Sequence, residues 1–369
     1  MTERSGGDGR PTLGILQVGR PESGVRRYAR IVADELAARP ELRIIEADAG
    51  LLEGRAGGLG RHGAAFRDAG AEVVLMQWNR RGWGRGPRSV ARFLDFRRAW
   101  RGPLIATLHD VFDRPRIRDR WLMPEVWSLR MLGRSADRLI VHSEVEVERL
   151  RGIVPAEKLR VIPHFVEERR LALGPAEARE RLGVADRRVV TILGFIYGRK
   201  GHKPTVEAIP QLPEDVLVVY AGGPVAGRDK VLGVVKQRRR ELGIEDRLRV
   251  TGYLSEEDLE AWISASHLAL LPFRDLSASG SLSTWIAAGK PILVSDLPGF
   301  REYDARVPGA LRFLGEPEPD RIAAAVREAL AGDLPEVDPA VVRLREELTV
   351  AKTADRYLAV AEELRGRRS

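Results

Sequence analysis

Short apolar runs alternate with amphipathic stretches along most of the chain. A first series of runs predicts strands at 12–18, 42–46, 73–77, 104–108, 138–141 and 159–162, and a second series predicts strands at 189–193, 217–221, 248–251, 268–271 and 292–294. Helical spacing of apolar residues, as in 24–38, fills most of the intervals. Buried strands separated by helices are typical of parallel sheets covered on both faces. The pattern therefore predicts two doubly wound α/β domains.

The domain boundaries follow from the places where this alternation stops. The polar segment 167–175 separates the two series, which predicts an N-terminal domain over 12–168 and a C-terminal domain over 172–349. The amphipathic segment 350–369 predicts a terminal helix that is free to cross back to the first domain. Residues 1–11 are polar and glycine-rich, and we expect them to be a disordered tail and not a signal peptide. The glycine-rich segment 50–63 lacks periodicity and predicts a mobile surface loop.

Composition narrows the class of protein. The 369 residues are 44% hydrophobic and 31% charged, and they include no cysteine, which excludes disulfides and thiolate chemistry. No run of about 18 uncharged apolar residues is present, so a cytoplasmic protein is expected. The net charge of +8 comes almost entirely from arginines that are scattered among acidic residues. Nucleic-acid surfaces usually cluster their charge, so nucleic acid is the least favoured partner, while contact with an anionic membrane surface stays open.

The most informative stretch is 267–300. A predicted strand at 268–271 leads into a loop containing Ser277, Ser279 and Ser281, then a helix, Gly289, and a second strand. Such a loop presents backbone N–H groups at a helix N-terminus, where about half a positive charge is concentrated, and this suits a diphosphate. The alternative is that the serines only turn the chain and cap a buried helix.

A second glycine-rich loop follows the strand at 189–193 and carries two cations, Arg199 and Lys200, next to Gly198. Cations placed beside a departing diphosphate stabilise the transition state more than the ground state. The alternative is a pair of solvated charges in a surface turn.

His109 follows the strand at 104–108. A histidine at such a position is either a structural packing residue or a catalytic residue. His142 and His164 also end strands, and we interpret both as packing or capping residues.

These elements resemble a family when taken in order. The motifs are Ser23-Gly24-Val25, Thr107-Leu108-His109-Asp110, Val161-Ile162-Pro163-His164, Gly194 with Lys200-Gly201, Ala221-Gly222-Gly223, and Gly289-Lys290-Pro291. Their order and spacing resemble the GT-B glycosyltransferases of family 4. The resemblance implies two Rossmann-like domains that face a cleft, with the acceptor on the N-terminal domain and a sugar nucleotide on the C-terminal domain. It also implies transfer with retention, without a metal, and contact between His109 and the donor sugar.

The chain departs from the family pattern at three positions. Two glutamates common in the family fall here at Leu276 and Thr284, and neither position is acidic. The arginine usual five residues before the lysine is Phe195, which leaves Arg199 as its substitute. A subset of the family has Ser-Gly where Ser279 and Gly280 stand, and the chain is similar to that subset.

We therefore predict a metal-independent glycosyltransferase that needs no cofactor besides its sugar-nucleotide donor. The residues expected to act are His109, Arg199 and Lys200 in catalysis, with Gly24, Gly198, Ser279, Gly280, Ser281, Leu282 and Thr284 at the donor. The segment 79–88 is a candidate acceptor loop. Trp83 lies in it and Trp78 directly before it, and these tryptophans either stack on the acceptor or pack in the core. The acceptor is a small molecule, a glycan or a lipid-linked group.

The alternatives are a catalytically silent GT-B partner subunit, which the missing glutamates make credible, and a nucleotide-sugar epimerase on the same fold. An acidic metal site at Glu46 and Asp48 is rejected, because no further residues complete an oxygen shell.

Overall fold

The chain folds into two compact units, each built around its own sheet. The computed structural model describes residues 2–4, 10–19, 23–50, 58–84, 87–109, 111, 124–224, 229–275, 279–332 and 334–366. Unit 1 comprises Met1–His164 with Val350–Ser369, and unit 2 comprises Phe165–Thr349. The first unit therefore takes residues from both ends of the chain, and the boundary lies close to the expected linker at 167–175.

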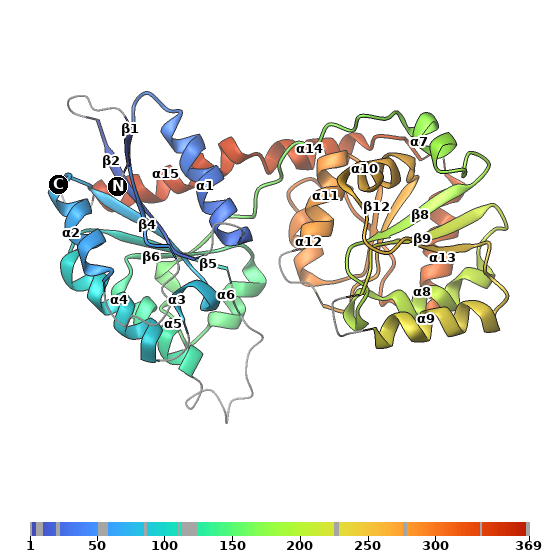
Figure 1. The fold of residues 1–369 in the computed structure, drawn as a ribbon, viewed down its shortest axis with the longest axis horizontal. Coiled ribbons are helices and arrows are strands. Elements are labelled where there is room, and N and C mark those ends of the chain that lie inside the picture. Colours follow the sequence, from blue (N-terminus) through green and yellow to red (C-terminus); the bar gives the residue numbers. More distant parts are fainter. Residues whose placement is uncertain are drawn as a thin grey trace. The chain divides into compact units, whose positions relative to one another are not determined.

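Unit 1 contains a sheet with strand order β1-β3-β2-β4-β5-β6-β7 (Figure 1). Its strands are β1 (Thr2–Arg4), β2 (Thr12–Gln17), β3 (Arg43–Asp48), β4 (Val73–Trp78), β5 (Leu104–Leu108), β6 (Arg138–Val141) and β7 (Leu159–Val161). Its helices are α1 (Gly24–Ala37), α2 (Gly60–Asp68), α3 (Arg80–Trp83), α4 (Pro87–Ala99), α5 (Pro124–Ser135), α6 (Glu144–Leu150), η1 (Ala156–Lys158) and α15 (Val350–Gly366). All neighbouring strands are parallel except β1, which pairs antiparallel with β3.

Unit 2 contains an entirely parallel sheet with strand order β10-β9-β8-β11-β12-β13. Its strands are β8 (Arg188–Leu193), β9 (Val216–Ala221), β10 (Leu248–Val250), β11 (Leu268–Leu271), β12 (Ile292–Val294) and β13 (Arg312–Phe313). Its helices are α7 (Pro175–Arg181), η2 (Gly198–Lys200), α8 (His202–Ala208), η3 (Ile209–Gln211), α9 (Lys230–Glu241), α10 (Glu256–Ala265), α11 (Gly280–Ala288), α12 (Pro298–Asp304), α13 (Pro319–Ala331) and α14 (Pro339–Glu347).

Alternation of side chains along buried strands explains the layers. Within β8, Val189 and Leu193 face a cluster that contains residues of α10, α11, α12 and α14, whereas Val190 and Ile192 face a cluster with residues of α8, α9 and α13. Both faces of this parallel sheet are therefore covered, as the continuous apolar runs predict. In unit 1, residues of α2, α4 and α5 pack on one face. Helix α15 lies beside α1 and contacts β4 (Figure 1).

The predicted strands are confirmed, with ends displaced by one or two residues, and the α/β fold class is confirmed with them. Two strands were missed. β13 is only two residues long and has no apolar run, and β1 lies in the predicted tail at 1–11, where its pairing with β3 corrects the expectation of disorder for Thr2–Arg4.

The loop predicted at 50–63 is also wrong in part. Residues 51–57 lie outside the described chain, but α2 begins at Gly60 and includes Gly63. A Cβ atom on Gly63 would lie 2.8 Å from the Phe96 carbonyl oxygen, so this glycine lets α2 approach α4 closely. The glycines that resembled a loop signal serve helix packing at this point.

Helix α15 is tied to unit 1 by hydroxyl and ionic contacts. The Tyr357 hydroxyl lies 2.7 Å from Thr107 Oγ1 and 3.3 Å from the Tyr28 hydroxyl, and all three residues are buried. Glu363 accepts hydrogen bonds from Arg138 and from Arg160, the latter at 3.1 Å. The last helix therefore completes the face of the sheet that α1 covers only in part.

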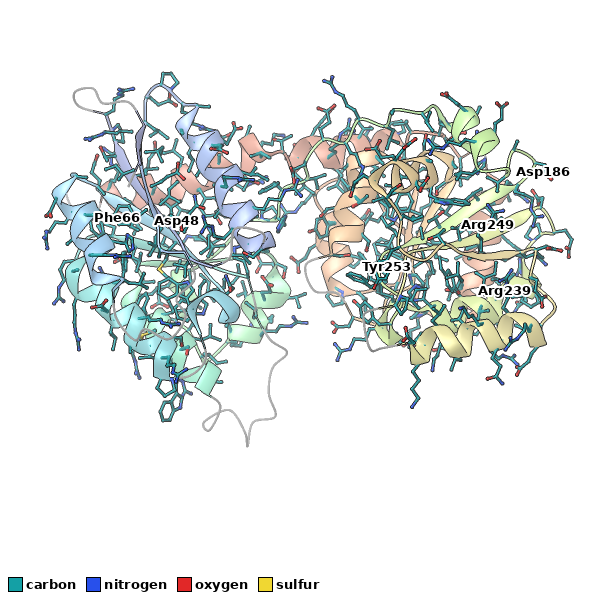
Figure 2. All side chains as sticks on the ribbon, viewed as in Figure 1. Asp48, Phe66, Asp186, Arg239, Arg249 and Tyr253 are labelled. Atoms are coloured by element: carbon teal, nitrogen blue, oxygen red, sulfur yellow. The ribbon has the colours of Figure 1, made fainter. Side chains whose placement is uncertain are left out.

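Phe66 on α2, labelled in Figure 2, tests this packing. Its ring is fully buried against Phe96 and Trp100, with ring centroids 6.4 and 6.5 Å away. We expect Phe66→Ala to lower the free energy of unfolding by about 3–5 kcal/mol, because the lost contacts leave a cavity. Urea denaturation of the full chain measures it. The exposed neighbour Arg67→Ala should change stability by less than about 0.5 kcal/mol, and equal effects of both variants would contradict the packing.

Candidate functional site

The strand order of unit 2 contains one point where the chain changes direction across the sheet. β8 and β11 are neighbours, but β9 and β10 extend from one side of β8 while β12 and β13 extend from the other side of β11. The helices that follow them cover opposite faces, since α8 residues belong to one core cluster and α11 residues to the other. Ligands of doubly wound folds bind outside the carboxyl ends of strands at such a switch point.

Both predicted loops lie at this point, and a lysine joins them. Lys200, at the end of the loop after β8, donates from Nζ to the Leu193 carbonyl oxygen at 3.0 Å and to Ser281 Oγ at 3.2 Å. The same Nζ lies 5.0 Å from the ring centroid of Phe273, which follows β11. The two loops therefore meet at one partly buried ammonium group.

Helix α11 begins beside this ammonium group. Ser279 caps the helix, accepting from the Leu282 N–H at 3.3 Å, and its hydroxyl lies 3.1 Å from Ser281 Oγ. Ser279 thus caps a buried helix, as one interpretation predicts, and Ser281 accepts from Lys200. Ser277 lies outside the described residues, and diphosphate binding by this loop stays a prediction. The helix N-terminus adds about half a positive charge to that of the lysine. The result is a compact region of positive potential.

Glycines bring the backbone of these loops close together. Gly201 has φ +73°, and a Cβ atom there would lie 2.1 Å from the Pro272 carbonyl oxygen. A Cβ atom on Gly222, which follows β9, would lie 2.2 Å from the Gly194 carbonyl oxygen. Neither position accepts a side chain without backbone movement. The loops after β8, β9 and β11 therefore require glycine for their approach.

Burial lowers the pKa of Lys200 from its ordinary value of 10.5 to about 8. Within the described chain, Lys200 donates hydrogen bonds to neutral oxygens, which offset the loss of hydration less than a carboxylate would. An anion placed beside the amine would supply that compensation and raise the pKa again. The site is thus suited to an anionic ligand.

Arg199 has a different environment from Lys200. Its side chain is 65% exposed and forms an ion pair with Asp275, a residue of the loop after β11. Its carbonyl oxygen accepts from the Arg274 N–H at 2.9 Å. Arg199 therefore helps to join the two loops, and Asp275 is a participant that the sequence reasoning missed, because an aspartate in a polar loop carries no distinguishing pattern.

The sequence also gave no sign of an aromatic pair at this edge of the sheet. Phe195, after β8, and Tyr253, after β10 and labelled in Figure 2, are 51% and 67% exposed, and their ring centroids lie 6.2 Å apart. Tyr253 lies over Gly223, where a Cβ atom would come within 3.1 Å of its ring, and its hydroxyl donates to the Pro224 carbonyl oxygen. Two neighbouring exposed aromatic rings therefore lie at the carboxyl ends of β8 and β10.

Of the two positions at which the family commonly has glutamates, Thr284 is described by the structure and Leu276 is not. Leu276 lies outside the described residues. Thr284 lies on α11, and its hydroxyl donates to the Gly280 carbonyl oxygen at 2.8 Å. This bond is local to the helix and typical of threonine within helices. Gly198 begins the short helical turn η2 that carries Arg199 and Lys200.

In unit 1, His109 belongs to a group of aromatic and imidazole rings. The ring centroid of Tyr28 lies 5.0 Å from that of His109, 5.5 Å from that of His142 and 4.8 Å from that of His164. Burial lowers the pKa of His109 well below 6.5 and that of His142 to about 4, and the neighbouring imidazoles act in the same direction. His109 is therefore neutral at pH 7 and cannot act as a general acid.

The other candidates of unit 1 have structural partners. Gly24 is the first residue of α1, which Ser23 caps, and Arg26 on this helix pairs with both oxygens of Asp48 at 2.7 Å. Trp78 and Trp83 stack on each other in the core, 5% and 0% exposed. The alternative that these tryptophans are packing residues is correct, and they do not line an acceptor site.

Two searches of the described residues gave negative results. No group of three or more histidine, aspartate or glutamate residues in that part of the chain could hold a metal ion. No helix there is both long enough and apolar enough to cross a bilayer.

Comparison with family models divides the chain in the same way as the fold. Residues 187–332 match the model described as Glycosyl transferases group 1, and residues 84–170 match the model described as Glycosyltransferase Family 4. The first match contains both loops of the switch point, and the second contains His109.

Curated relatives match over part of their length. The chain is 28% identical over 159 residues to a GDP-mannose-dependent alpha-(1-6)-phosphatidylinositol monomannoside mannosyltransferase of Mycolicibacterium smegmatis, which covers 41% of this chain and 40% of that protein. It is 27% identical over 222 residues to a D-inositol 3-phosphate glycosyltransferase of Thermobispora bispora, covering 55% of this chain and 51% of that protein. The chain thus spans about half or less of the length of these relatives.

Solved structures match over nearly the whole chain. The crystal structure of Anabaena Alr3699/HepE in complex with UDP has a TM-score of 0.69 at 16% identity, and covers 95% of this chain and 99% of that one. A glycosyltransferase from Rickettsia africae has a TM-score of 0.72 at 14% identity, and covers 96% and 98%. At this level of identity, the likeness establishes the fold, which is that of the GT-B proteins.

The lowered pKa of Lys200 has a measurable consequence for stability. Between pH 8 and pH 10.5 the folded state releases the lysine proton while the unfolded state keeps it, so the unfolded state binds more protons and stability rises with pH. Below pH 8 both states are protonated and the cost of the buried charge is fully present. We expect Lys200→Met to remove this rise. Urea denaturation of the wild type and the variant at pH 7.5 and 9.5 measures it, and parallel pH profiles would contradict the lowered pKa.

Proposed function

We propose that the chain, which matches the models of group 1 and family 4 glycosyltransferases and has the GT-B fold, transfers a sugar from a nucleotide-diphosphate donor to an acceptor hydroxyl. The observation that carries the proposal is the meeting of two loops at Lys200, beside the N-terminus of α11 and at the switch point of the sheet. A diphosphate is the ligand whose charge and size match an ammonium group and a helix N-terminus in contact.

The proposed chemistry needs no nucleophile from the protein. As the bond between the sugar and the diphosphate breaks, negative charge develops on the leaving phosphate, and Lys200 with the N–H groups of Gly280, Ser281 and Leu282 stabilises it. Arg199 reinforces this effect by exchanging Asp275 for the phosphate, since an exposed ion pair costs little to break. Retention of the anomeric configuration and independence from metal and cofactor belong to this proposal.

The aromatic pair gives the donor an orientation in the same proposal. Phe195 and Tyr253 lie after β8 and β10, and the donor's nucleobase would contact their exposed faces while the diphosphate points toward Lys200. Stacking on aromatic rings is tolerant of base identity. Phe195 stands where the family usually has an arginine, so this part of the site relies on apolar contact instead of charge.

His109 has the role of a neutral contact to the donor sugar in this proposal, which rests on the family resemblance and on its uncharged state. The acceptor is a small molecule, a glycan or a lipid-linked group, and the names of the relatives include inositol phosphate and phosphatidylinositol mannoside acceptors. A cytoplasmic location and peripheral contact with an anionic membrane also stay proposals.

A second candidate is a catalytically silent partner subunit. Thr284 occupies the position of a family glutamate, and its hydroxyl donates a hydrogen bond to the Gly280 carbonyl oxygen within α11. That position therefore lacks a carboxylate for the donor. A silent subunit would bind a nucleotide diphosphate without releasing it from a sugar, whereas an epimerase on this fold would release it without an acceptor.

Lys200→Ala tests the proposal directly, with Lys203→Ala as the control. Lys203 is exposed on the first turn of α8, three residues after Lys200. Its substitution by alanine therefore removes the same charge outside the proposed site. We expect Lys200→Ala to weaken binding of UDP and GDP, measured by calorimetry at pH 7, and to lower turnover of UDP-glucose or GDP-mannose by about 10²- to 10³-fold. Lys203→Ala should match the wild type.

The outcomes separate the candidate functions. Unchanged nucleotide binding in Lys200→Ala would remove the proposed site, and nucleotide binding without release of UDP or GDP from any sugar nucleotide would favour the silent subunit. Binding by the wild type should also weaken as the pH rises above 8, because the neutral amine no longer attracts the diphosphate.

A further inference from the structure

Neighbouring strands of unit 1 place polar groups at their carboxyl ends, and these groups form a continuous hydrogen-bonded chain. Gln77 lies in β4, His109 follows β5, His142 follows β6 and Ile162 follows β7. His109 Nε2 lies 2.6 Å from Gln77 Oε1, and His109 Nδ1 lies 3.4 Å from His142 Nε2. His142 Nδ1 lies 3.0 Å from the Ile162 carbonyl oxygen. One end of this hydrogen-bonded series is therefore a backbone carbonyl group, which has no proton to donate.

That backbone group sets the direction of the bonds. A carbonyl oxygen only accepts, so His142 Nδ1 must carry a proton and donate it to Ile162. Because the pKa of His142 is lowered to about 4, this histidine carries a single ring proton at pH 7. His142 Nε2 is consequently an unprotonated acceptor that points toward His109.

The state of His109 follows from that of His142. A proton on His109 Nδ1 makes a hydrogen bond to His142 Nε2, whereas a proton on Nε2 would leave two nitrogen lone pairs facing each other at 3.4 Å. His109 Nε2 then accepts, and the Gln77 amide meets it with its NH₂ group, since rotation of the amide exchanges its oxygen and nitrogen. The same rotation turns the amide oxygen toward Tyr357, whose hydroxyl can donate to it.

We propose that His142 is a positioning residue that keeps the proton of His109 on Nδ1 and fixes the plane of its ring. The proposal rests on the proposed function insofar as His109 contacts the donor sugar. A neutral imidazole with one defined tautomer and orientation presents a constant face to a ligand, and groups that orient a functional histidine typically contribute 10- to 100-fold to its effect.

The surroundings of this pair support a fixed state. Tyr28 of α1 contacts both rings, and Tyr357 of α15 lies at the Gln77 end of the hydrogen-bonded series. The carboxylate of Glu146, on α6, accepts from the backbone N–H of His142 at 2.7 Å. It therefore holds the backbone of His142 in place.

Nitrogen-15 NMR of the imidazole rings in the full chain tests the proposal without any substrate. We expect His109 of the wild type to be protonated on Nδ1 at pH 7, and to become a mixture of tautomers in His142→Phe, which keeps the ring contact with Tyr28. His142→Gln should restore the Nδ1 proton, because its amide oxygen can accept where Nε2 did. His164→Phe is the matched control and should leave His109 unchanged.

Kinetics provide the second measurement. With UDP-glucose or GDP-mannose, His142→Phe should lower kcat by roughly 10- to 100-fold with little change in KM, and His142→Gln should recover most of the loss. A wild-type His109 protonated on Nε2, or an unchanged tautomer in His142→Phe, would overturn the proposal. Absence of activity in every variant including the wild type would instead count against the proposed function, since the NMR result does not depend on turnover.

Discussion

A single partly buried ammonium group organises the candidate site. Lys200 contacts the end of its own strand through the Leu193 carbonyl and the start of a distant helix through Ser281. Neighbouring parallel strands β8 and β11 bring the two loops to the same edge, and Gly201 allows their backbones to approach. Gly222 likewise lets the loop after β9 approach the backbone of Gly194. Without a carboxylate partner among its hydrogen bonds, the lysine pays for burial with a lowered pKa. This unfavourable state is what makes an anionic ligand favourable there.

The sequence predicted the architecture well because both sheets are parallel and buried on two faces. Such strands are continuous apolar runs, and the runs are separated by helices of recognisable period. β13 was not predicted because two residues cannot form an apolar run. The loop prediction was wrong at Gly63 because a glycine where two helices pack closely cannot be told from a loop glycine by sequence. These failures are local, and neither changes the position of the switch point.

The site was only partly predictable for a different reason. Glycine and serine patterns indicated the loops and Lys200, since their backbone requirements are visible in the sequence. The partners that define the electrostatics come from elsewhere in the chain. Asp275 beside Arg199, Tyr253 beside Phe195, and His142 beside His109 are long-range pairs that no spacing rule reveals. The two tryptophans show that a residue type alone does not reveal its partners. Trp78 and Trp83 were candidates for contact with the acceptor, and they are buried against each other.

The division of unit 1 between the two ends of the chain constrains how the protein is made. Helix α15 supplies Tyr357 and Glu363 to unit 1, yet it follows the whole of unit 2 along the chain (Figure 1). Unit 2 is continuous from Phe165 to Thr349 and has all its residues before α15 leaves the ribosome. Domains fold as units during translation, so the part of unit 1 that precedes unit 2 keeps some of one sheet face uncovered until α15 has been synthesised. Unit 2 can therefore complete its fold before unit 1 does, although unit 1 begins first along the chain.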